Sequence, residues 1–299
     1  MPFTAKSGKF NASINAVEFG TGDKAVKIGG ENVFPLYSFD AAIENAPKVG
    51  IEITDFGMEH EPECIKKYYE GCATLADMAR KAASMEGVDF LSFRMEGGDP
   101  NGANKSTEEL IGELKEIADA VDLPLVVCGC KNVEKDAELF SKAAEALNGK
   151  NAVILSAKEE NYKTVGAAAG LAYKQVVGAE SAVDINLAKQ LNVLISQLGV
   201  DSKSVVMNVG TAAVGYGFEY VISTMDRVKA AALQQGDANL QMPIITPVAS
   251  EAWGVKEAMA SETDAPEWGS QEERGIDMEV ETAMAVIAAG SNAVILKHP

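Results

Sequence analysis

The sequence has little histidine and little cysteine. Only His60 and His298 occur among its 299 residues, so a histidine-based metal centre or acid/base pair has few candidates. The four cysteines are Cys64, Cys72, Cys128 and Cys130. They are too few for a disulfide scaffold in a chain of this length, and their spacing does not match the clustered ligands of zinc or iron–sulfur sites. We therefore expect free thiols and no metal ligand.

Basic side chains and long apolar runs are also scarce. The chain has 26 lysine and arginine residues against 44 acidic ones, a net charge of −18 that would repel nucleic acid and anionic membranes. No apolar run reaches the roughly 18 residues that span a bilayer, and the first ten residues lack the apolar core of a signal peptide. The composition predicts a cytoplasmic protein that binds neither nucleic acid nor membrane.

Short β-branched runs alternate with amphipathic helical segments from residue 49 onward, and this pattern favours a parallel sheet covered by helices. Eight such units of roughly 31 residues match the size of a (β/α)8 TIM barrel. The alternative, a doubly wound open sheet, is less favoured because no G-x-G-x-x-G follows the first strand. The predicted strands are Val49–Asp55, Phe90–Met95, Pro124–Cys130, Ala152–Ala157, Gln175–Ala179, Val205–Val209, Pro243–Val248 and Ala293–His298.

Residues 1–48 form a predicted N-terminal extension to the barrel domain of residues 49–299. Within it, Ile14–Phe19 and Ala25–Ile28 flank a Gly-Thr-Gly-Asp turn at residues 20–23, which is typical of a β-hairpin. We expect this hairpin to cap one end of the barrel.

Helix ends are marked by recognisable capping residues. Ser106 with Glu109 and Ser270 with Glu273 have capping-box spacing. The last helix carries an apolar stripe that we expect to face the core, and no helical segment follows the eighth strand in these 299 residues. Further predicted caps are Asn132, Asn161 and Asp184; the stripe consists of Ile276, Val280, Ala283 and Ile287.

The stretch Val205–Tyr220 is the strongest candidate for a site. A buried strand ends at Asn208, and a glycine-rich loop leads into a helix that begins near Gly217. Ligands of parallel α/β proteins bind at such carboxyl ends of strands. One interpretation is a helix entry that needs flexible backbone, and the other is a loop that approaches a ligand. Apolar residues and Tyr216 within the loop favour a flat, partly apolar ligand over a phosphate.

Other polar residues at strand ends have simpler structural interpretations. Asp99–Gly102 is typical of a turn, and Asp184 is a helix cap. Glu180 and Glu251 would form a carboxylate pair for acid/base chemistry, but nothing nearby in the sequence raises either pKa. We therefore assign no catalytic residue.

Several motifs, in one order from about residue 25 to the end, resemble the small subunit of the corrinoid iron–sulfur protein. This family is also called the delta subunit of the acetyl-CoA decarbonylase/synthase complex. The likeness of the ordered set is far more specific than that of any single motif. The motifs are DPNGAN at Asp99–Asn104, EENYK at Glu159–Lys163, DINLAKQLNVLI at Asp184–Ile195, GYGFEY at Gly215–Tyr220, EAW at Glu251–Trp253 and ERGI at Glu273–Ile276.

The resemblance implies a TIM barrel in a heterodimer with a large subunit, which carries a four-iron cluster and a corrinoid (cobalamin) domain facing the barrel. Such a pair carries a methyl group from methyltetrahydrofolate, delivered by a separate methyltransferase, to acetyl-CoA synthase. This is carbon fixation by the anaerobic reductive acetyl-CoA (Wood–Ljungdahl) pathway. The family's small subunit has no metal ligand and no established catalytic residue, so we expect a non-catalytic subunit.

On this resemblance we predict a corrinoid-facing set of strand-end and loop residues. The alternative is a pterin-binding TIM-barrel methyltransferase that acts directly on methyltetrahydrofolate, with Asp99, Asn101 and Asn208 as pterin contacts. The predicted cofactor-facing residues are Asn186, Asn208, Gly210, Thr211, Gly215, Tyr216, Gly217, Thr246 and Glu251.

Overall fold

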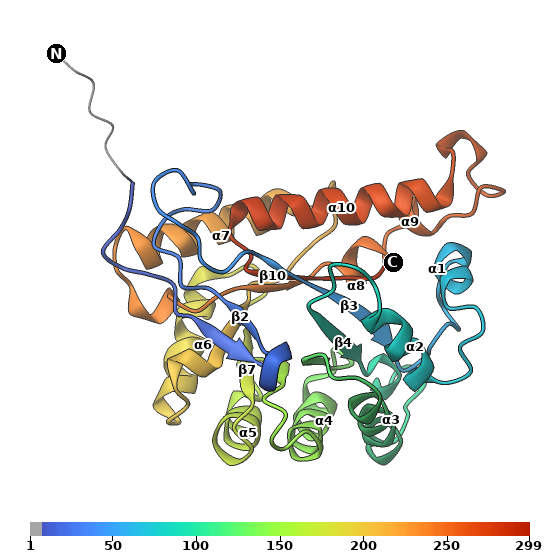
Figure 1. Ribbon diagram of the computed structural model, residues 1–299, viewed down its shortest axis with the longest axis horizontal. Coiled ribbons are helices and arrows are strands. Elements are labelled where there is room, and N and C mark those ends of the chain that lie inside the picture. The colour runs from blue at the N-terminus through green and yellow to red at the C-terminus, as the bar shows by residue number, and fades with distance from the viewer. Residues whose placement is uncertain (1–7) are drawn as a thin grey trace.

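A computed structural model, which describes residues 8–299, contains an eight-stranded parallel barrel (Figure 1). Neighbouring strands follow the order β8-β7-β6-β5-β4-β3-β10-β9. The ring closes where the amide of Met207 donates to the carbonyl of Pro243 at 2.8 Å. The predicted TIM barrel and its eight strands are confirmed. The strands are β3 (Lys48–Thr54), β4 (Phe90–Arg94), β5 (Leu125–Cys128), β6 (Val153–Ala157), β7 (Val176–Glu180), β8 (Val205–Asn208), β9 (Ile245–Pro247) and β10 (Ala293–Leu296).

Helices surround the barrel on its outer side (Figure 1). They are α1 (Glu63–Tyr68), α2 (Leu75–Ala83), α3 (Thr107–Ala120), α4 (Val133–Ala146), α5 (Tyr162–Val165), α6 (Ile185–Gln197), α7 (Phe218–Leu233), α8 (Ala249–Ala252), α9 (Lys256–Met259) and α10 (Gln271–Ala289). The π-helical segment η3 (Gly166–Ala172) continues α5. Short 3-10 turns are η1 (Gly22–Lys24), η2 (Glu96–Gly98), η4 (Ser202–Ser204), η5 (Ala238–Leu240) and η6 (Pro266–Trp268).

Most predicted caps are confirmed. The side chains of Ser106, Asn132, Asp184 and Ser270 accept hydrogen bonds from the first turns of α3, α4, α6 and α10. Asn161 differs, because its side chain accepts from the amide of Lys158 and donates to the carbonyl of Val133 instead of capping α5. It therefore ties the loop after β6 to the start of α4.

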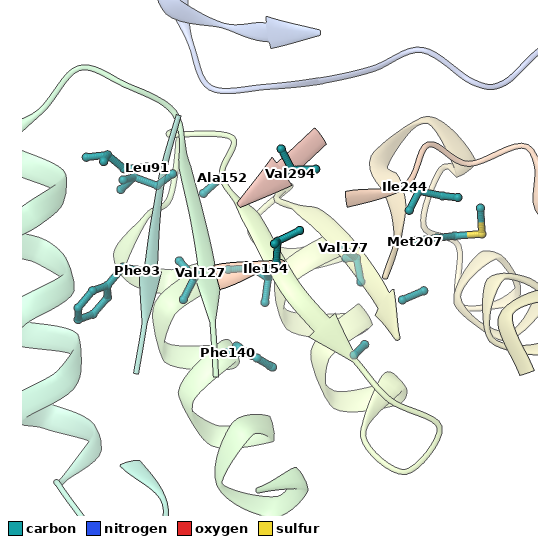
Figure 2. Close-up of a cluster of buried hydrophobic side chains, with 14 of the residues drawn as sticks. Leu91, Phe93, Val127, Phe140, Ala152, Ile154, Val177, Met207, Ile244 and Val294 are labelled. Carbon is teal, nitrogen blue, oxygen red and sulfur yellow. The ribbon is translucent and has the colours of Figure 1, made fainter. Parts of the chain in front are cut away.

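Strand side chains alternate between the barrel interior and the layer beneath the helices, as the two-residue period requires. Figure 2 shows the outer set, in which Leu91, Phe93 and Val127 lie between strands and helices. On β4, Phe90 instead belongs to the interior cluster. Gly50 on the adjacent strand makes room for it, because a Cβ there would meet the Phe90 ring at 2.1 Å.

The predicted hairpin is confirmed as strands β1 (Val17–Phe19) and β2 (Val26–Ile28). Val17, Phe19, Val26 and Ile28 all point into the interior cluster and pack with the barrel's inward-facing residues. The Phe19 and Phe90 rings meet edge to face with centroids 5.5 Å apart. The hairpin thus seals the amino end of the barrel with apolar side chains.

A buried polar cluster ties the N-terminal segment to α7 and to the start of β10. Lys229, whose side chain is 1% exposed, donates to Glu31 at 2.9 Å and to Asn292 at 3.0 Å. Asn292 also donates to Glu31 at 2.9 Å. Burial raises the pKa of Glu31, but Lys229 and Asn292 outweigh it, so the pKa is lowered. Lys229 and Asn292 share one Glu31 oxygen, so the buried charge of this carboxylate depends on both of them.

We predict that Lys229→Met lowers the free energy of unfolding by about 3 kcal/mol, because it leaves the Glu31 carboxylate buried without its cation. Lys189→Met is the matched control: its ion pair with Asp237 is exposed, and the expected loss is under about 1 kcal/mol. Urea unfolding of both variants measures the difference. Adding Glu31→Gln to Lys229→Met should recover part of the loss, and equal losses for the two lysine variants would contradict the argument.

The end of β10 is held by a buried carboxylate on α10. Glu279 accepts hydrogen bonds from the backbone amides of Lys297 at 2.6 Å and His298 at 3.0 Å. The His298 ring stacks on Trp253 with centroids 5.9 Å apart, and the Lys297 ammonium pairs with Glu61 at 2.8 Å. Burial is the largest influence on Glu279 and raises its pKa from 4.5 to about 7, although the two amides oppose it.

We predict a pH-dependent stability difference between Glu279→Gln and the unsubstituted chain. Between 4.5 and about 7 the folded state keeps a proton that the unfolded state has lost, so folding stability falls as pH rises through this window. The glutamine variant lacks this fall, so its stability relative to the unsubstituted chain should rise by on the order of 3 kcal/mol and level off at higher pH. Glu281→Gln, exposed on the same helix, serves as the control in urea unfolding across this range. Parallel pH profiles for all three proteins would rule the effect out.

Candidate functional site

The barrel interior becomes polar toward the carboxyl ends of the strands, which form its mouth. Inward positions near these ends carry Glu52 on β3, Arg94 on β4, Ser156 on β6, Glu180 on β7 and Asn208 on β8. All of them are buried or largely buried. Since the opposite end is closed by the hairpin, this mouth is where the barrel offers polar chemistry to a ligand.

Arg94 and Glu52 form a buried ion pair between neighbouring strands. The guanidinium Nε and one terminal nitrogen each lie 2.8 Å from the same carboxylate oxygen. Burial alone would lower the pKa of Arg94, but the Glu52 carboxylate outweighs it and the pKa is raised. The guanidinium is therefore charged and engaged with the Glu52 side chain.

A hydrogen-bonded chain crosses the other half of the mouth. Asn208 donates to the Ser156 hydroxyl at 3.1 Å, and this hydroxyl donates to Glu180 at 3.0 Å. Lys158 pairs with the other Glu180 oxygen at 3.2 Å. The side-chain oxygen of Asn208 accepts a hydrogen bond from the backbone amide of Gly210 at 3.0 Å. This bond fixes the start of the glycine-rich loop.

Two adjoining cavities of about 290 and 390 Å³ occupy the mouth. Arg94, Gly129, Lys131 and Ser250 line both, and the ion pair between Lys131 and Glu251, at 3.1 Å, lies beside this boundary. Four cationic and seven acidic side chains line the pair of cavities, and every cation is paired with a carboxylate. The cations are Arg94, Lys131, Lys158 and Lys297; the acids are Glu52, Glu61, Glu96, Asp99, Asp136, Glu180 and Glu251.

The loop between β8 and α7 forms one side of the mouth. Gly210, Gly215 and Gly217 have φ values of 87°, 87° and 78°, a region that favours glycine. Thr211 lines the first cavity, and its hydroxyl oxygen is buried without a hydrogen-bond partner among residues 8–299. Farther out, the exposed Tyr216 hydroxyl donates to Glu257 at 2.5 Å. The loop therefore borders the cavity with Thr211 and places an aromatic ring at its rim.

The predicted cofactor-facing residues fall into three groups: residues that line a cavity, residues of the outer loop, and residues that lie elsewhere. Asn208, Gly210, Thr211 and Glu251 line the first cavity. Gly215, Tyr216 and Gly217 form the outer part of the loop, with Tyr216 half exposed.

The other two predicted residues lie neither in the lining of a cavity nor in the loop. Asn186 is exposed in the first turn of α6. Thr246 is fully buried in the barrel wall, where its hydroxyl lies 2.8 Å from that of Ser291. A role in ligand binding stays a prediction for all nine residues.

The structure also shows where the Glu180 and Glu251 carboxylates and the predicted Asp99–Gly102 turn lie. Glu180 and Glu251 both line the first cavity, but each is paired with a lysine, so neither is positioned as a free acid or base. Asp99 accepts hydrogen bonds from the backbone and side-chain nitrogens of Asn101, which agrees with the predicted turn, and it also lines the second cavity.

Sequence reasoning missed several residues that define the mouth. Glu52 and Arg94 stand out as charged residues at alternate positions within predicted buried strands, and this signal would have placed them inside the barrel. Ser156 and Cys128 occupy equivalent inward positions and line the first cavity. Lys158 follows β6 directly, but its pairing with Glu180 depends on the neighbouring strand.

Within the part of the chain that the structure describes, no group of three or more His, Cys, Asp or Glu side chains is arranged to hold a metal ion. No helix among residues 8–299 is both long and apolar enough to cross a membrane.

Comparison with solved structures supports the barrel architecture. Dihydropteroate synthase from Xanthomonas albilineans, solved with 4-aminobenzoic acid, superposes with a TM-score of 0.51. The match has 12% sequence identity and covers 84% of this chain and 87% of that enzyme. At this identity the likeness concerns the fold alone.

Comparison with characterised sequences identifies the family. The model of the CO dehydrogenase/acetyl-CoA synthase delta subunit family matches residues 16–296. Subunit delta 1 of the acetyl-CoA decarbonylase/synthase complex from Methanosarcina thermophila is 30% identical over 287 residues, and subunit delta from Archaeoglobus fulgidus is 32% identical over 289 residues. The matches cover 94% of this chain but only 64% and 62% of those relatives. The chain belongs to the CO dehydrogenase/acetyl-CoA synthase delta subunit family.

Proposed function

We propose that this chain is the small subunit of a corrinoid iron–sulfur methyl carrier and that its barrel mouth covers the corrinoid held by a large subunit. The observation that carries the proposal is the shape of the mouth: two adjoining cavities bordered by a glycine-rich loop, with the exposed rings of Tyr216 and Tyr220 beside it. Such a surface suits a broad, partly apolar ligand presented from outside.

The charges of the mouth support a corrinoid better than a phosphate-bearing ligand. Each cation lining the cavities is already paired with a carboxylate, so none is left to bind a phosphate. The excess of acids suits the amide groups that surround a corrin ring. These acceptors fit the group without supplying a ligand to its metal.

The role of the chain in this arrangement is to shield and position. A corrinoid, when bound, supplies the cobalt nucleophile that accepts and passes on a methyl group. Asn208 and Ser156 hold the wall of the cavity in one geometry, and the glycines of the loop let the backbone approach closely. The rim excludes water from the reacting face.

The proposed partners follow from the same function. They are the large subunit, with its four-iron cluster and corrinoid domain, the methyltransferase that uses methyltetrahydrofolate, and acetyl-CoA synthase. Family membership supports this, because the relatives are named as subunits of an acetyl-CoA decarbonylase/synthase complex.

We predict that Gly215→Leu lowers the cobalt content of the complex several-fold when the chain is co-expressed with its large subunit. The side chain would project from the rim, where nothing lies within 4 Å of a Cβ at this position. Gly149→Leu is the matched control, since Gly149 has a similar φ of 83° and equally open surroundings but follows α4 at the far end of the barrel. Cobalt analysis and the visible spectrum of the purified complex provide the measurement.

Subunit association must be measured on the same samples. If both variants associate normally with the large subunit and Gly215→Leu alone loses cobalt, the mouth faces the corrinoid. Equal cobalt content in the two complexes, with unchanged methyl transfer, would show that the loop lies elsewhere.

The second candidate function is a methyltransferase that binds the pterin itself. The amide of Asn208 and the carboxylate of Glu180 lie together in the mouth, a donor and an acceptor that suit the edge of a pterin ring. Titration of the isolated chain with methyltetrahydrofolate distinguishes the two functions. Tight binding that Asn208→Ala weakens would favour the enzyme, whereas the carrier subunit is expected to show no tight binding.

A further inference from the structure

Helix α10 carries an apolar flank that the rest of the described chain leaves open. Sequence periodicity placed Ile276, Val280, Ala283 and Ile287 toward the core, but Val280 is 50% exposed and the neighbouring Met284 is 64% exposed. The prediction is wrong for Val280 because the core-facing side of α10 is formed by Glu279, Thr282, Ala283 and Val286. We name Ile276, Val280, Met284 and Ile287 the α10 stripe.

The neighbours of α10 explain why this flank is bare. The helix packs mainly against α7, α8 and α9, and Thr282 and Arg274 hydrogen-bond to segments on that side. The α10 stripe lies about a third of a turn around the helix axis from the core-facing side. Figure 1 shows α10 lying along one edge of the molecule. In a (β/α)8 barrel each helix packs between two neighbours, and among residues 8–299 no helix packs on this flank of α10.

The apolar surface continues beyond the C-terminal end of α10. A cavity of about 290 Å³ lies there, and Ile287 lines it together with residues of the segment before β3. Leu36, which is 65% exposed, belongs to this segment. The other apolar side chains that line the cavity are Pro35, Ile43, Ala46 and Pro47. The surface is therefore about as long as α10 itself, which at 19 residues measures about 28 Å.

Exposed acidic residues run beside the α10 stripe. Glu273, Asp277 and Glu281 are exposed on α10, and each lies three residues before a member of the stripe, namely Ile276, Val280 and Met284. A second copy of this chain would bring the same acids face to face, with a net charge of −18 on each copy. The flank thus disfavours self-association and complements a basic partner.

We propose that the α10 stripe is the docking surface for an amphipathic helix of another polypeptide, whose apolar face is bordered by lysine or arginine. The partner helix takes the place of a neighbouring barrel helix and buries Val280 and Met284. Its basic border lies against Glu273, Asp277 and Glu281. Its far end reaches the cavity lined by Ile287 and Leu36. This surface is separate from the barrel mouth, so the inference does not depend on the proposed corrinoid-covering function.

The test uses the full chain and synthetic helical peptides of about 18 residues, close to the 19-residue length of α10. One peptide has a leucine and alanine stripe bordered by lysines, a second has the same stripe bordered by glutamates, and a third has the lysine composition in scrambled order. Fluorescence anisotropy measures binding at low salt. We expect the lysine-bordered peptide to bind at least about tenfold more tightly than the other two.

Variants of the chain locate the binding. Val280→Asp with Met284→Asp should abolish binding, and circular dichroism confirms that these exposed substitutions leave the fold intact. Met259→Asp, on α9, is the matched control at another exposed methionine and should bind normally. Replacing Glu273, Asp277 and Glu281 by lysine should reverse the preference, so that the glutamate-bordered peptide binds more tightly.

Other outcomes would overturn the proposal. Equal binding of all three peptides, or binding that survives Val280→Asp with Met284→Asp, would show that the stripe is not the docking surface. Concentration-dependent dimerisation in sedimentation equilibrium, removed by that double substitution but not by Met259→Asp, would assign the surface to a second copy of the chain.

Discussion

The apolar seal at the amino end of the barrel determines where this molecule can carry polar chemistry. The β1–β2 hairpin fills that end with Val17, Phe19, Val26 and Ile28, so the lower interior is a dry core. Parallel strands place alternate residues inward along their whole length, and only the upper inward positions remain near solvent. The buried Arg94–Glu52 pair lies at this boundary, where a mismatched charge would be costly and each charge therefore has a partner.

The same constraint explains why the fold was predictable from the sequence. Strands buried on both faces are short β-branched runs, and the runs at Leu125–Cys128 and Val205–Asn208 were found for that reason. Capping side chains such as Ser106 mark helix starts locally. The helices between β3 and β4 are harder to predict: α1 has only six residues, and the main local signal for α2 is the capping box of Thr74 and Asp77.

The site was less predictable, because side-chain direction depends on strand register and on neighbours distant in sequence. Asn208 was placed correctly at a strand end. Thr246 lies between Ile245 and Pro247, both inward-facing, so it faces the outer layer and Ser291. A strand of only three residues gives too few alternations to fix that direction beforehand. The pairing of Lys131 with Glu251 joins residues 120 positions apart and has no local signal.

Helix α10 connects the two surfaces of the molecule. Glu279 on its inner side holds the backbone of Lys297, and Lys297 lines the second mouth cavity. The next residue, Val280, belongs to the outer stripe. A partner that shifts α10 therefore moves a carboxylate whose hydrogen bonds fix part of the cavity wall. The buried hydrogen bonds of Glu279 thus tie the helix that carries the apolar flank to the strand end that borders the mouth.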